Sequence, residues 1–260
     1  MQFSGKNIVL TGAAGGLGRA FALGFAERGA NVVVADMNEA GSAETVSLIE
    51  SAGGKAIAVQ TNVTDKASCE AVADAAVATF GSLDVLVNNA AIYATIERAN
   101  FWEIDPNEWD KVMAVNVKGA WLASGAAYTR MSDGGSIINI ASVQTALARP
   151  SIAPYTATKG AVGNLTKGMA TDWAKHGLNC NAIAPGYIAT PLTARNRYPM
   201  PFLMRAEDFA QSAVRSIERG DRYRVIPWPM GIVAKILKVL PDALFDRLLK
   251  GQPRKHRHKD

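Results

Sequence analysis

The stretch TGAAGGLG, from Thr11 to Gly18, decides the fold, because it joins the apolar run NIVL to a segment of helical periodicity at 16–29. Its glycines allow a tight turn and let the backbone approach a pyrophosphate at the start of the helix. Helix–strand packing also selects glycine, so this turn alone is weak evidence for a ligand. The residues expected to contact one are Gly12, Gly15, Gly16, Leu17 and Gly18.

Outward from this turn, short β-branched runs alternate with longer segments of helical periodicity. The expected strands are NIVL, NVVVAD, AIAVQT, LDVLVN, SIINIAS and LNCNAIAP, and the expected helices cover 16–29, 38–52, 65–80, 107–130 and 154–176. Such alternation produces a parallel sheet with helices on both faces. The sequence therefore predicts a doubly wound, Rossmann-type α/β fold in a single domain, 1–260, with a helical C-terminal extension.

The alternation ends after about residue 190. Residues 191–219 are predicted to form a substrate loop followed by a helix near 206–219, and RYRVIP is the only candidate for a final strand. Two apolar-faced helices are expected within 229–250, followed by a basic tail at 251–260. The apolar faces require cover, which could come from the body of the subunit, from an oligomer contact or from a membrane surface.

Composition limits the class of protein. With 260 residues, 48% of them hydrophobic, the chain can bury one sizeable core. Two cysteines and three histidines, without metal-ligand spacing, predict neither a disulfide framework nor a metal site. The net charge is +5, but residues 251–260 carry +3 of it, so no nucleic-acid partner is expected. The N-terminal apolar run of three residues is neither a signal peptide nor a membrane span, and we expect a cytoplasmic protein.

A carboxylate stands where a dinucleotide fold needs one. Asp36 ends the second predicted strand, 18 residues after Gly18, and can accept hydrogen bonds from both ribose hydroxyls of an adenosine. A 2′-phosphate would be repelled by this charge, and neither Gly15 nor Met37 supplies a cation. The expected cofactor is NAD rather than NADP.

A second stretch, SIAPYTATKG from Ser151 to Gly160, places a phenol and an ammonium four residues apart. If it is helical, Tyr155 and Lys159 lie on the same face. The lysine charge would favour the phenolate and lower the tyrosine pKa below its reference of about 10, giving a usable acid or base. With six Tyr and thirteen Lys in 260 residues, such a pair is expected by chance about 0.3 times (6 × 13/260), so alone it proves little.

Several motifs in register give the pair its meaning, because the chain from Thr11 to about Thr190 resembles the short-chain dehydrogenase/reductase family. The matching motifs are TGAAGGLG, NNAA at 88–91, Asn116 in VNVKG, Ser142 at 13 residues before Tyr155, and PGYIAT at 185–190. The resemblance implies that Tyr155 is the general acid/base and that Lys159 lowers its pKa and holds the nicotinamide ribose. It also implies that Ser142 hydrogen-bonds the substrate oxygen and that Asn116 supports a water-linked proton path.

The remaining cofactor contacts are implied by the same resemblance. Asn62 and Val63 should face the adenine, Asn89 and Ala90 the adenosine ribose and the strand-end backbone, and a last group the nicotinamide amide: Pro185, Gly186, Ile188 and Thr190. Met37, next to Asp36, is expected beside the adenosine. The tryptophans at 102, 109 and 121 are expected to serve packing rather than the site.

The chain departs from the family pattern in three places. Asn62 replaces an aspartate, which keeps an acceptor for the adenine amino group but loses a charge. NNAA lacks a final glycine, and the family's C-terminal strand and ending are absent. The part after about Leu192 resembles a different branch of the family, so the chain is either a natural divergent member or a recombinant.

The resulting prediction is an NAD-dependent oxidoreductase that interconverts a secondary alcohol and a ketone by hydride transfer, acting as a homo-oligomer, either dimer or tetramer. Membrane contact is not expected. The substrate class stays open between a hydrophobic or cyclic alcohol, a sugar or polyol, and a 3-oxoacyl thioester. The alternative from another class is a catalytically silent dinucleotide-sensing protein, which usually lacks the tyrosine or the lysine.

Overall fold

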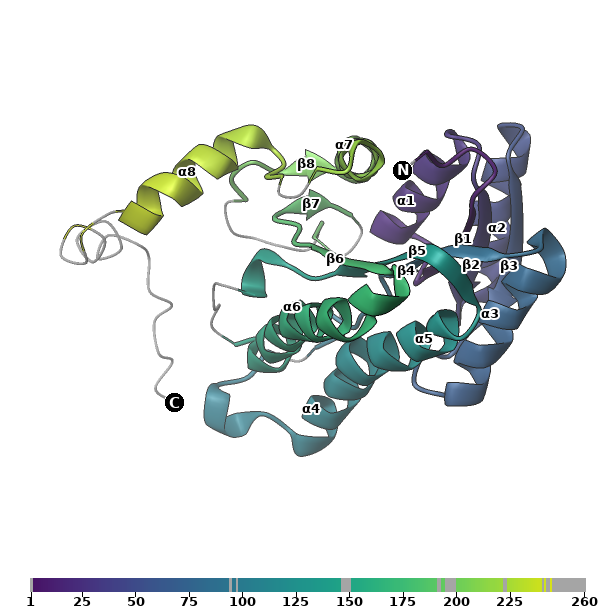
Figure 1. Ribbon diagram of the computed structural model, residues 1–260. Coiled ribbons are helices and arrows are strands. Elements are labelled where there is room, and N and C mark those ends of the chain that lie inside the picture. The colour runs from purple at the N-terminus through teal and green to yellow at the C-terminus, as the bar shows by residue number, and fades with distance from the viewer. Residues whose placement is uncertain are drawn as a thin grey trace. The chain divides into compact units, whose positions relative to one another are not determined.

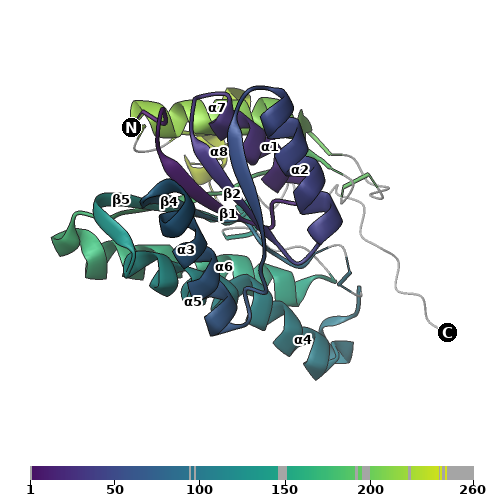
Figure 2. The same ribbon diagram turned by 90° about the vertical axis from the view of Figure 1, so that its right-hand side faces the viewer.

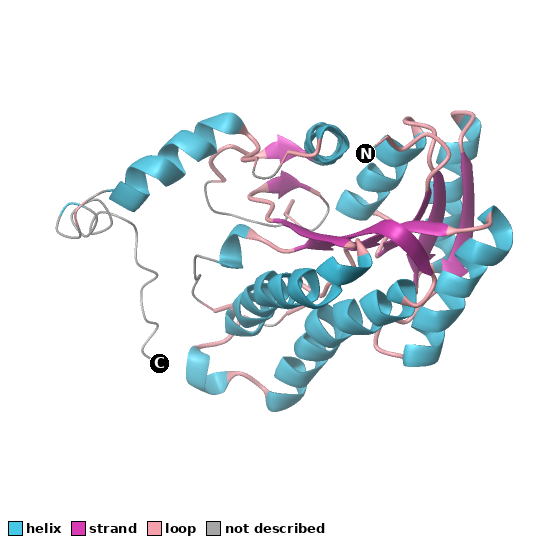
Figure 3. Cartoon of the chain, in the orientation of Figure 1, coloured by secondary structure: helices cyan, strands magenta, loops and turns pink. Residues whose placement is uncertain are grey.

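Six parallel strands form one sheet in the computed structural model, which describes residues 2–93, 95–96, 98–145, 151–190, 193–194, 200–221, 224–239, 241 and 244. The strand order is β3-β2-β1-β4-β5-β6. Figure 3 shows this sheet between layers of helix, which confirms the predicted doubly wound fold. The strands are β1 (Asn7–Thr11), β2 (Asn31–Asp36), β3 (Lys55–Gln60), β4 (Leu83–Asn88), β5 (Met131–Ile140) and β6 (Asn179–Ile183).

Helices cover both faces of the sheet (Figures 1 and 2). On one face lie α1 (Gly16–Ala26), α2 (Glu39–Ser51) and α7 (Ala206–Arg219). On the other lie α3 (Lys66–Phe80), α4 (Pro106–Met113), α5 (Gly119–Tyr128) and α6 (Ala153–Trp173). The two central strands β1 and β4 read as continuous apolar runs because both of their faces are buried.

The core on the α3 and α5 face is built from β-branched strand residues against alanine-rich helices. Val33, Leu86 and Ile137 are fully or almost fully buried there, against Ala76 and Ala127. On the opposite face Phe21 of α1 packs edge-to-face on Phe209 of α7, with ring centroids 6.2 Å apart. Small helix residues let the helices approach the sheet closely, which fixes the strand ends that carry the polar residues described below.

The strand order places the functional edge of the sheet. From β1 the chain proceeds outward to β2 and β3, and from β4 it proceeds in the opposite direction to β5 and β6. A crevice for ligands forms at the carboxyl ends of the strands where this order reverses. Here the reversal lies between β1 and β4, the strands that precede the glycine-rich turn and the NNAA segment.

Two predicted elements differ from the structure, and one element of the structure was not predicted. The helix expected at 107–130 is two helices joined by a π-helical turn, Ala114–Lys118. The strand expected at RYRVIP is wrong for residues 224–227, which are irregular, and the rest of it lies outside the described residues. A two-stranded parallel sheet, β7 (Ile188–Ala189) with β8 (Met204–Arg205), was not predicted, since its strands are too short to show periodicity.

The chain divides into two compact units, Met1–Asp221 and Arg222–Asp260. The second contains α8 (Trp228–Val239), which agrees with the first of the two predicted C-terminal helices. Most of the second of these helices and the basic tail lie outside the described residues, as do parts of the predicted substrate loop. Within the described ranges, none of the helices is long and apolar enough to cross a membrane.

Candidate active site

The glycine-rich turn is braced by the segment that follows β4. Gly12 has φ +67°, and a Cβ there would lie 2.7 Å from the Cα of Ala90. A Cβ on Gly18 would lie 2.1 Å from the Gly12 carbonyl oxygen. The Asn89 side-chain amide donates hydrogen bonds to the carbonyls of Thr11 (3.0 Å) and Gly12 (2.9 Å). Only glycine therefore fits at positions 12 and 18. The hydrogen bonds from Asn89 hold the backbone of the turn in place.

The start of α1 offers backbone donors for an anion. Gly15 precedes the helix in an extended conformation without a side-chain cap, and the first helical hydrogen bond runs from Arg19 N–H to Gly15 O. The N–H groups of the first turn therefore have no partner within the helix. Thr190 lies close by, because a Cβ added to Gly16 would be 3.9 Å from the Thr190 Cβ. The turn and the Pro-Gly segment, far apart in sequence, thus meet over one helix start.

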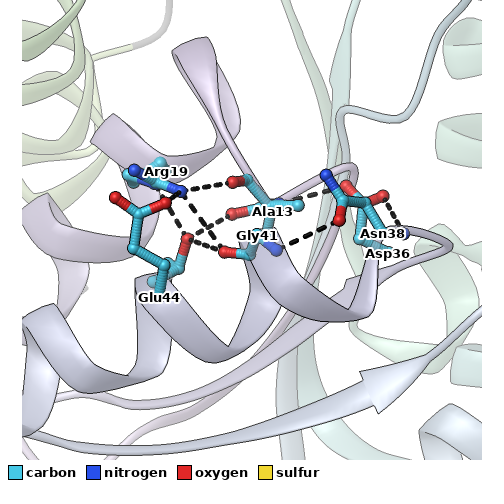
Figure 4. Close-up of polar contacts among 8 residues, drawn as sticks. Ala13, Arg19, Asp36, Asn38, Gly41 and Glu44 are labelled. Carbon is cyan, nitrogen blue, oxygen red and sulfur yellow. Dashed lines mark hydrogen bonds and ion pairs between the residues drawn. The ribbon is translucent and has the colours of Figure 1, made fainter.

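Asp36 lies at the end of β2 and faces the turn (Figure 4). Its Oδ2 accepts a hydrogen bond from Ala14 N–H at 3.0 Å, and its Oδ1 accepts one from Asn38 N–H at 3.0 Å. A carboxylate offers about four acceptor positions, so about two remain for ribose hydroxyls. Met37 beside it is 65% exposed and brings no charge.

Beneath the turn lies a polar cluster that the sequence analysis missed. Arg19 donates to the carbonyls of Ala14 (2.7 Å) and Gly41 (3.3 Å), to Thr45 Oγ1 (3.0 Å) and to Glu44 Oε2 (2.6 Å). Figure 4 shows Arg19 and Glu44 side by side beneath the turn. An arginine directly after a glycine-rich turn, with a glutamate on the next helix, is the signal that could have suggested it.

Asn62 and Val63, the two residues predicted to contact the adenine, already make contacts within the protein. Asn62 Oδ1 accepts hydrogen bonds from both the N–H (3.0 Å) and the hydroxyl (2.8 Å) of Thr64. These use both lone pairs of the oxygen that was expected to accept from the adenine amino group. Asn62 therefore stabilises its own turn in this structure. Val63 is buried and packs against Gly119. A Cβ added to Gly119 would lie only 2.7 Å from Val63 Cγ2.

Ser142, Tyr155 and Lys159 come together at the carboxyl end of β5. A side-chain hydrogen bond joins Ser142 to Tyr155. Lys159 is 4% exposed, donates from Nζ to the Ile140 carbonyl at 2.7 Å, and lies 5.6 Å from the centre of the Tyr155 ring. The structure therefore places the three predicted catalytic side chains in one site, two of them on the same face of α6.

The prediction of a lowered pKa for Tyr155 is wrong for this structure. Burial raises the pKa of Tyr155 to about 12, and the hydrogen bond from Ser142 offsets only part of that effect. Lys159 directs its ammonium to Ile140, and burial lowers its own pKa to about 8. The i, i+4 spacing correctly brings the residues onto one face but does not determine where the ammonium points, so desolvation dominates.

Asn116 lies in the π-helical turn and is buried. Its Oδ1 accepts from Ile92 N–H at 2.7 Å, while its Nδ2 donates to Ile92 O at 3.1 Å and to Thr158 Oγ1 at 3.2 Å. It therefore fixes the segment after NNAA against α6. Tyr93, which follows Ile92, packs edge-to-face on Tyr155 with ring centroids 4.6 Å apart. Sequence analysis missed Tyr93, which lies outside every motif used.

Buried hydrogen bonds attach α6 to the sheet. Asn139 of β5 donates to Thr166 Oγ1 at 2.9 Å, and Asn88 of β4 donates to Asn139 Oδ1 at 2.8 Å. Asn88 also donates to Ser124 Oγ at 2.8 Å. Because buried polar groups are costly when unpaired, these bonds fix the position of the helix that carries Tyr155 and Lys159.

The Pro-Gly segment closes the site beside Ser142. Val143 N–H donates to Pro185 O at 3.1 Å, and Thr193 Oγ1 donates to Ile188 O at 2.6 Å and accepts from Thr190 N–H at 3.0 Å. Pro185 and Ile188 are buried, whereas Gly186 is exposed. The segment that was expected to face the nicotinamide therefore contacts Val143, next to Ser142, and also lies beside the start of α1.

Comparison with known proteins agrees with this geometry. The family model described as short chain dehydrogenase matches residues 6–200. Gluconate 5-dehydrogenase from Gluconobacter oxydans is 45% identical over 199 residues, 75% of this chain and 75% of that protein.

Two solved structures of similar fold contain different nicotinamide cofactors. A 3-ketoacyl-(acyl-carrier-protein) reductase from Brucella melitensis complexed with NADH has a TM-score of 0.75 at 32% identity, covering 82% of this chain and 91% of that one. A short chain dehydrogenase from Burkholderia cenocepacia in complex with NADP has a TM-score of 0.77 at 27% identity, covering 84% and 92%. Similar folds thus bind either cofactor, and the choice depends on local residues.

Proposed function

Because the chain belongs to the short chain dehydrogenase family, we propose that it is an NAD-dependent oxidoreductase that interconverts a secondary alcohol and a ketone, with Tyr155 as the general acid/base. The observation that carries the proposal is the hydrogen-bonded pair of Ser142 and Tyr155 with the Lys159 ammonium buried beside it. The 185–190 segment connects this group to the glycine-rich turn, since Pro185 accepts from Val143 N–H and Thr190 lies beside Gly16. Asp36 contacts the same turn at Ala14.

In the oxidising direction, Ser142 hydrogen-bonds the substrate oxygen while the Tyr155 phenolate takes the proton from the substrate hydroxyl. The C–H bond of the carbinol carbon breaks, and its electron pair leaves as hydride. A nicotinamide dinucleotide, when bound, would supply the hydride acceptor, and its oxidised ring would add a positive charge to the site. Lys159 supplies a second positive charge that favours the phenolate. In the reducing direction Tyr155 returns the proton, and Asn116 with Lys159 supports a water-linked path for its replacement.

NAD is favoured over NADP by the surroundings of Asp36. The carboxylate keeps about two acceptor positions free after bonding Ala14 and Asn38, which suits a pair of ribose hydroxyls. A 2′-phosphate would meet this negative charge with the apolar Met37 beside it. The predicted contacts of Asn89 and the 185–190 segment with the cofactor remain part of the proposal. The predicted Asn62 side-chain contact does not, because Thr64 occupies both lone pairs of Asn62 Oδ1.

The substrate is proposed to be a small secondary alcohol or its ketone. The likeness to a gluconate 5-dehydrogenase favours a sugar acid or polyol, and the likeness to a 3-ketoacyl reductase supports a 3-oxoacyl thioester as second candidate. A panel of sugar acids, cyclic alcohols and 3-hydroxyacyl thioesters, each assayed with NAD and NADP by the absorbance of the reduced nicotinamide, tests both.

The Tyr155→Phe variant is the control for that panel. It should lose about 10²–10⁴-fold in turnover while its NAD affinity changes by no more than a few-fold, because only the proton-transferring group is removed. Retention of more than about a tenth of the activity would contradict the assignment of Tyr155. NAD binding without turnover on any substrate would favour the dinucleotide-sensing alternative.

A homo-oligomer is proposed because large apolar side chains are exposed in the 3-10 turn Phe101–Glu103, which precedes α4, and on α5. Phe101, Trp102 and Trp121 are 76%, 70% and 56% exposed. Beside Trp121 a depression of about 460 Å³ is lined by Met113, Val117 and Leu165 among others. Contiguous exposed apolar surface commonly marks a protein contact. Light scattering should report a dimer or tetramer, and a monomer at assay concentration would count against this part of the proposal.

A further inference from the structure

The guanidinium of Arg19 joins the glycine-rich turn to α2. On the turn it donates to Ala14 O, and on α2 it donates to Gly41 O, Thr45 Oγ1 and Glu44 Oε2. Its side chain is only 23% exposed. The hydrogen bond from Arg19 also lowers the pKa of Glu44, so the glutamate is charged and the two residues form an ion pair 2.6 Å long.

The backbone of the turn is held at three consecutive polar groups. Asp36 accepts from Ala14 N–H at 3.0 Å, Arg19 donates to Ala14 O at 2.7 Å, and Thr45 Oγ1, 0% exposed, lies 3.0 Å from Ala13 O. The peptide groups on both sides of Ala14 are therefore fixed. Neither can rotate without breaking a bond to a buried or charged side chain, and such losses are costly.

The close approach of α2 leaves little alternative to this arrangement. A Cβ on Gly41 would lie 2.8 Å from Ala14 O, so the carbonyl and the helix already touch. Among charged side chains, only the planar fork of arginine donates in several fixed directions at once. A lysine would present a single ammonium and could not reproduce the separate bonds to Ala14 O and Thr45.

We propose that Arg19 is a positioning residue for the adenosine half of the dinucleotide. It acts through Ala14. The Ala14 N–H orients the Asp36 carboxylate, and the Ala14 carbonyl leads directly into Gly15 and the start of α1. The proposal rests on the proposed function, because it concerns the same cofactor site. Arg19 itself contacts neither substrate nor nicotinamide, so its loss should weaken cofactor binding without slowing the chemical step.

The experiment compares Arg19→Gln with the unmodified protein. We expect the Kd for NAD to rise about tenfold, the size of a lost charge-assisted hydrogen-bond set, while kcat at saturating NAD changes by less than about twofold. The Kd for ADP-ribose should rise by the same factor, whereas that for nicotinamide mononucleotide should not change. A residue with a merely structural role would not separate these two fragments.

Arg130→Gln is the matched control. Arg130 is also 23% exposed, forms an ion pair with Asp74 (2.6 Å) and donates to Ala126 O (3.2 Å), but it lies on the α3 and α5 side of the sheet. Its replacement should lower the melting temperature to a similar degree and leave all three Kd values unchanged. If Arg19→Gln does not fold, Thr45→Val is measured instead, with an expected rise of about threefold in the Kd for NAD and for ADP-ribose.

The outcomes separate this inference from the proposed function. Unmodified protein that binds neither NAD nor ADP-ribose overturns both. Unmodified protein that turns over with NAD, together with an Arg19→Gln or Thr45→Val variant whose Kd values match those of Arg130→Gln, overturns only the role of Arg19. An equal loss of affinity for ADP-ribose and nicotinamide mononucleotide would also overturn it, because the effect would then not be confined to the adenosine half.

Discussion

Burial of Lys159 should make the stability of the protein depend on pH in a defined direction. Burial lowers the pKa of Lys159 from 10.5 to about 8. Between these two values the unfolded chain holds the proton and the folded chain does not, so stability rises with pH in this window. At about 1.4 kcal/mol per pKa unit, the lysine lowers stability by about 3 kcal/mol below pH 8, and most of this is relieved by pH 10.

Lys159→Met isolates this effect, because methionine is similarly long, unbranched and uncharged. The variant leaves Ile140 O without its donor, a loss that does not change with pH. The difference in unfolding free energy, unmodified protein minus variant, should therefore increase by about 2–3 kcal/mol between pH 7 and pH 10. Above pH 10 Tyr155, whose pKa rises from 10.0 to about 12, contributes in the opposite direction, so the comparison stops there.

Urea denaturation of the cofactor-free protein at pH 7, 8, 9 and 10 provides the measurement. Lys167→Met is the control, since this lysine is exposed on the same helix and should leave the pH dependence unchanged. A difference between the unmodified protein and Lys159→Met that stays constant within about 1 kcal/mol, or that decreases toward pH 10, would refute the argument from burial.

Three further predictions concern the cofactor site and the proton. Asp36→Ala should reduce the preference for NAD over NADP in measured Kd values, and adding Met37→Arg should reverse it; an unmodified protein that prefers NADP contradicts this. Gly18→Ala should lose about 1–3 kcal/mol in unfolding free energy and most NAD binding, whereas Gly125→Ala, with open space around it, should lose neither. Between pH 7 and pH 10, kcat/KM should rise with pH for alcohol oxidation and should not rise for ketone reduction, because Tyr155 must be deprotonated in one direction and protonated in the other.

Much of the fold could be predicted because its signals are local. At Gly18 a Cβ would meet the Gly12 carbonyl oxygen, six residues earlier in the chain, so this need for glycine is local. The alternating periods of strands and helices can also be read directly from the sequence. The π-helical turn at Ala114–Lys118 could not be predicted, since it has the same apolar pattern as a continuous helix. The short strands at Ile188–Ala189 and Met204–Arg205 pair across 14 intervening residues of chain and show no period of their own.

In the candidate site too, residues within sequence motifs could be predicted, whereas residues whose roles depend on tertiary contacts could not. Ser142, Tyr155 and Lys159 could be predicted to lie together because they occur in register with other motifs, and Asp36 could be predicted to lie near the turn because a strand ends there. Arg19 and Tyr93 were missed because their roles depend on tertiary contacts, with Glu44 in one case and with the Tyr155 ring in the other. Sequence spacing indicates which residues share a helix face, but it does not indicate which acceptor a long side chain reaches.

The acceptor that Lys159 reaches affects the protonation state of Tyr155. With a pKa near 12, Tyr155 is protonated at neutral pH in the cofactor-free structure, and Lys159, with a pKa near 8, still carries its charge. The ammonium lies 5.6 Å from the ring centre but is hydrogen-bonded to Ile140 O, and its attraction does not outweigh desolvation of the phenol. For the proposed alcohol oxidation, the proton acceptor therefore has to be generated by positive charge arriving with the cofactor or by movement of the ammonium toward the phenol. Under the proposed function, Tyr155 stays in its acid form until the dinucleotide is bound.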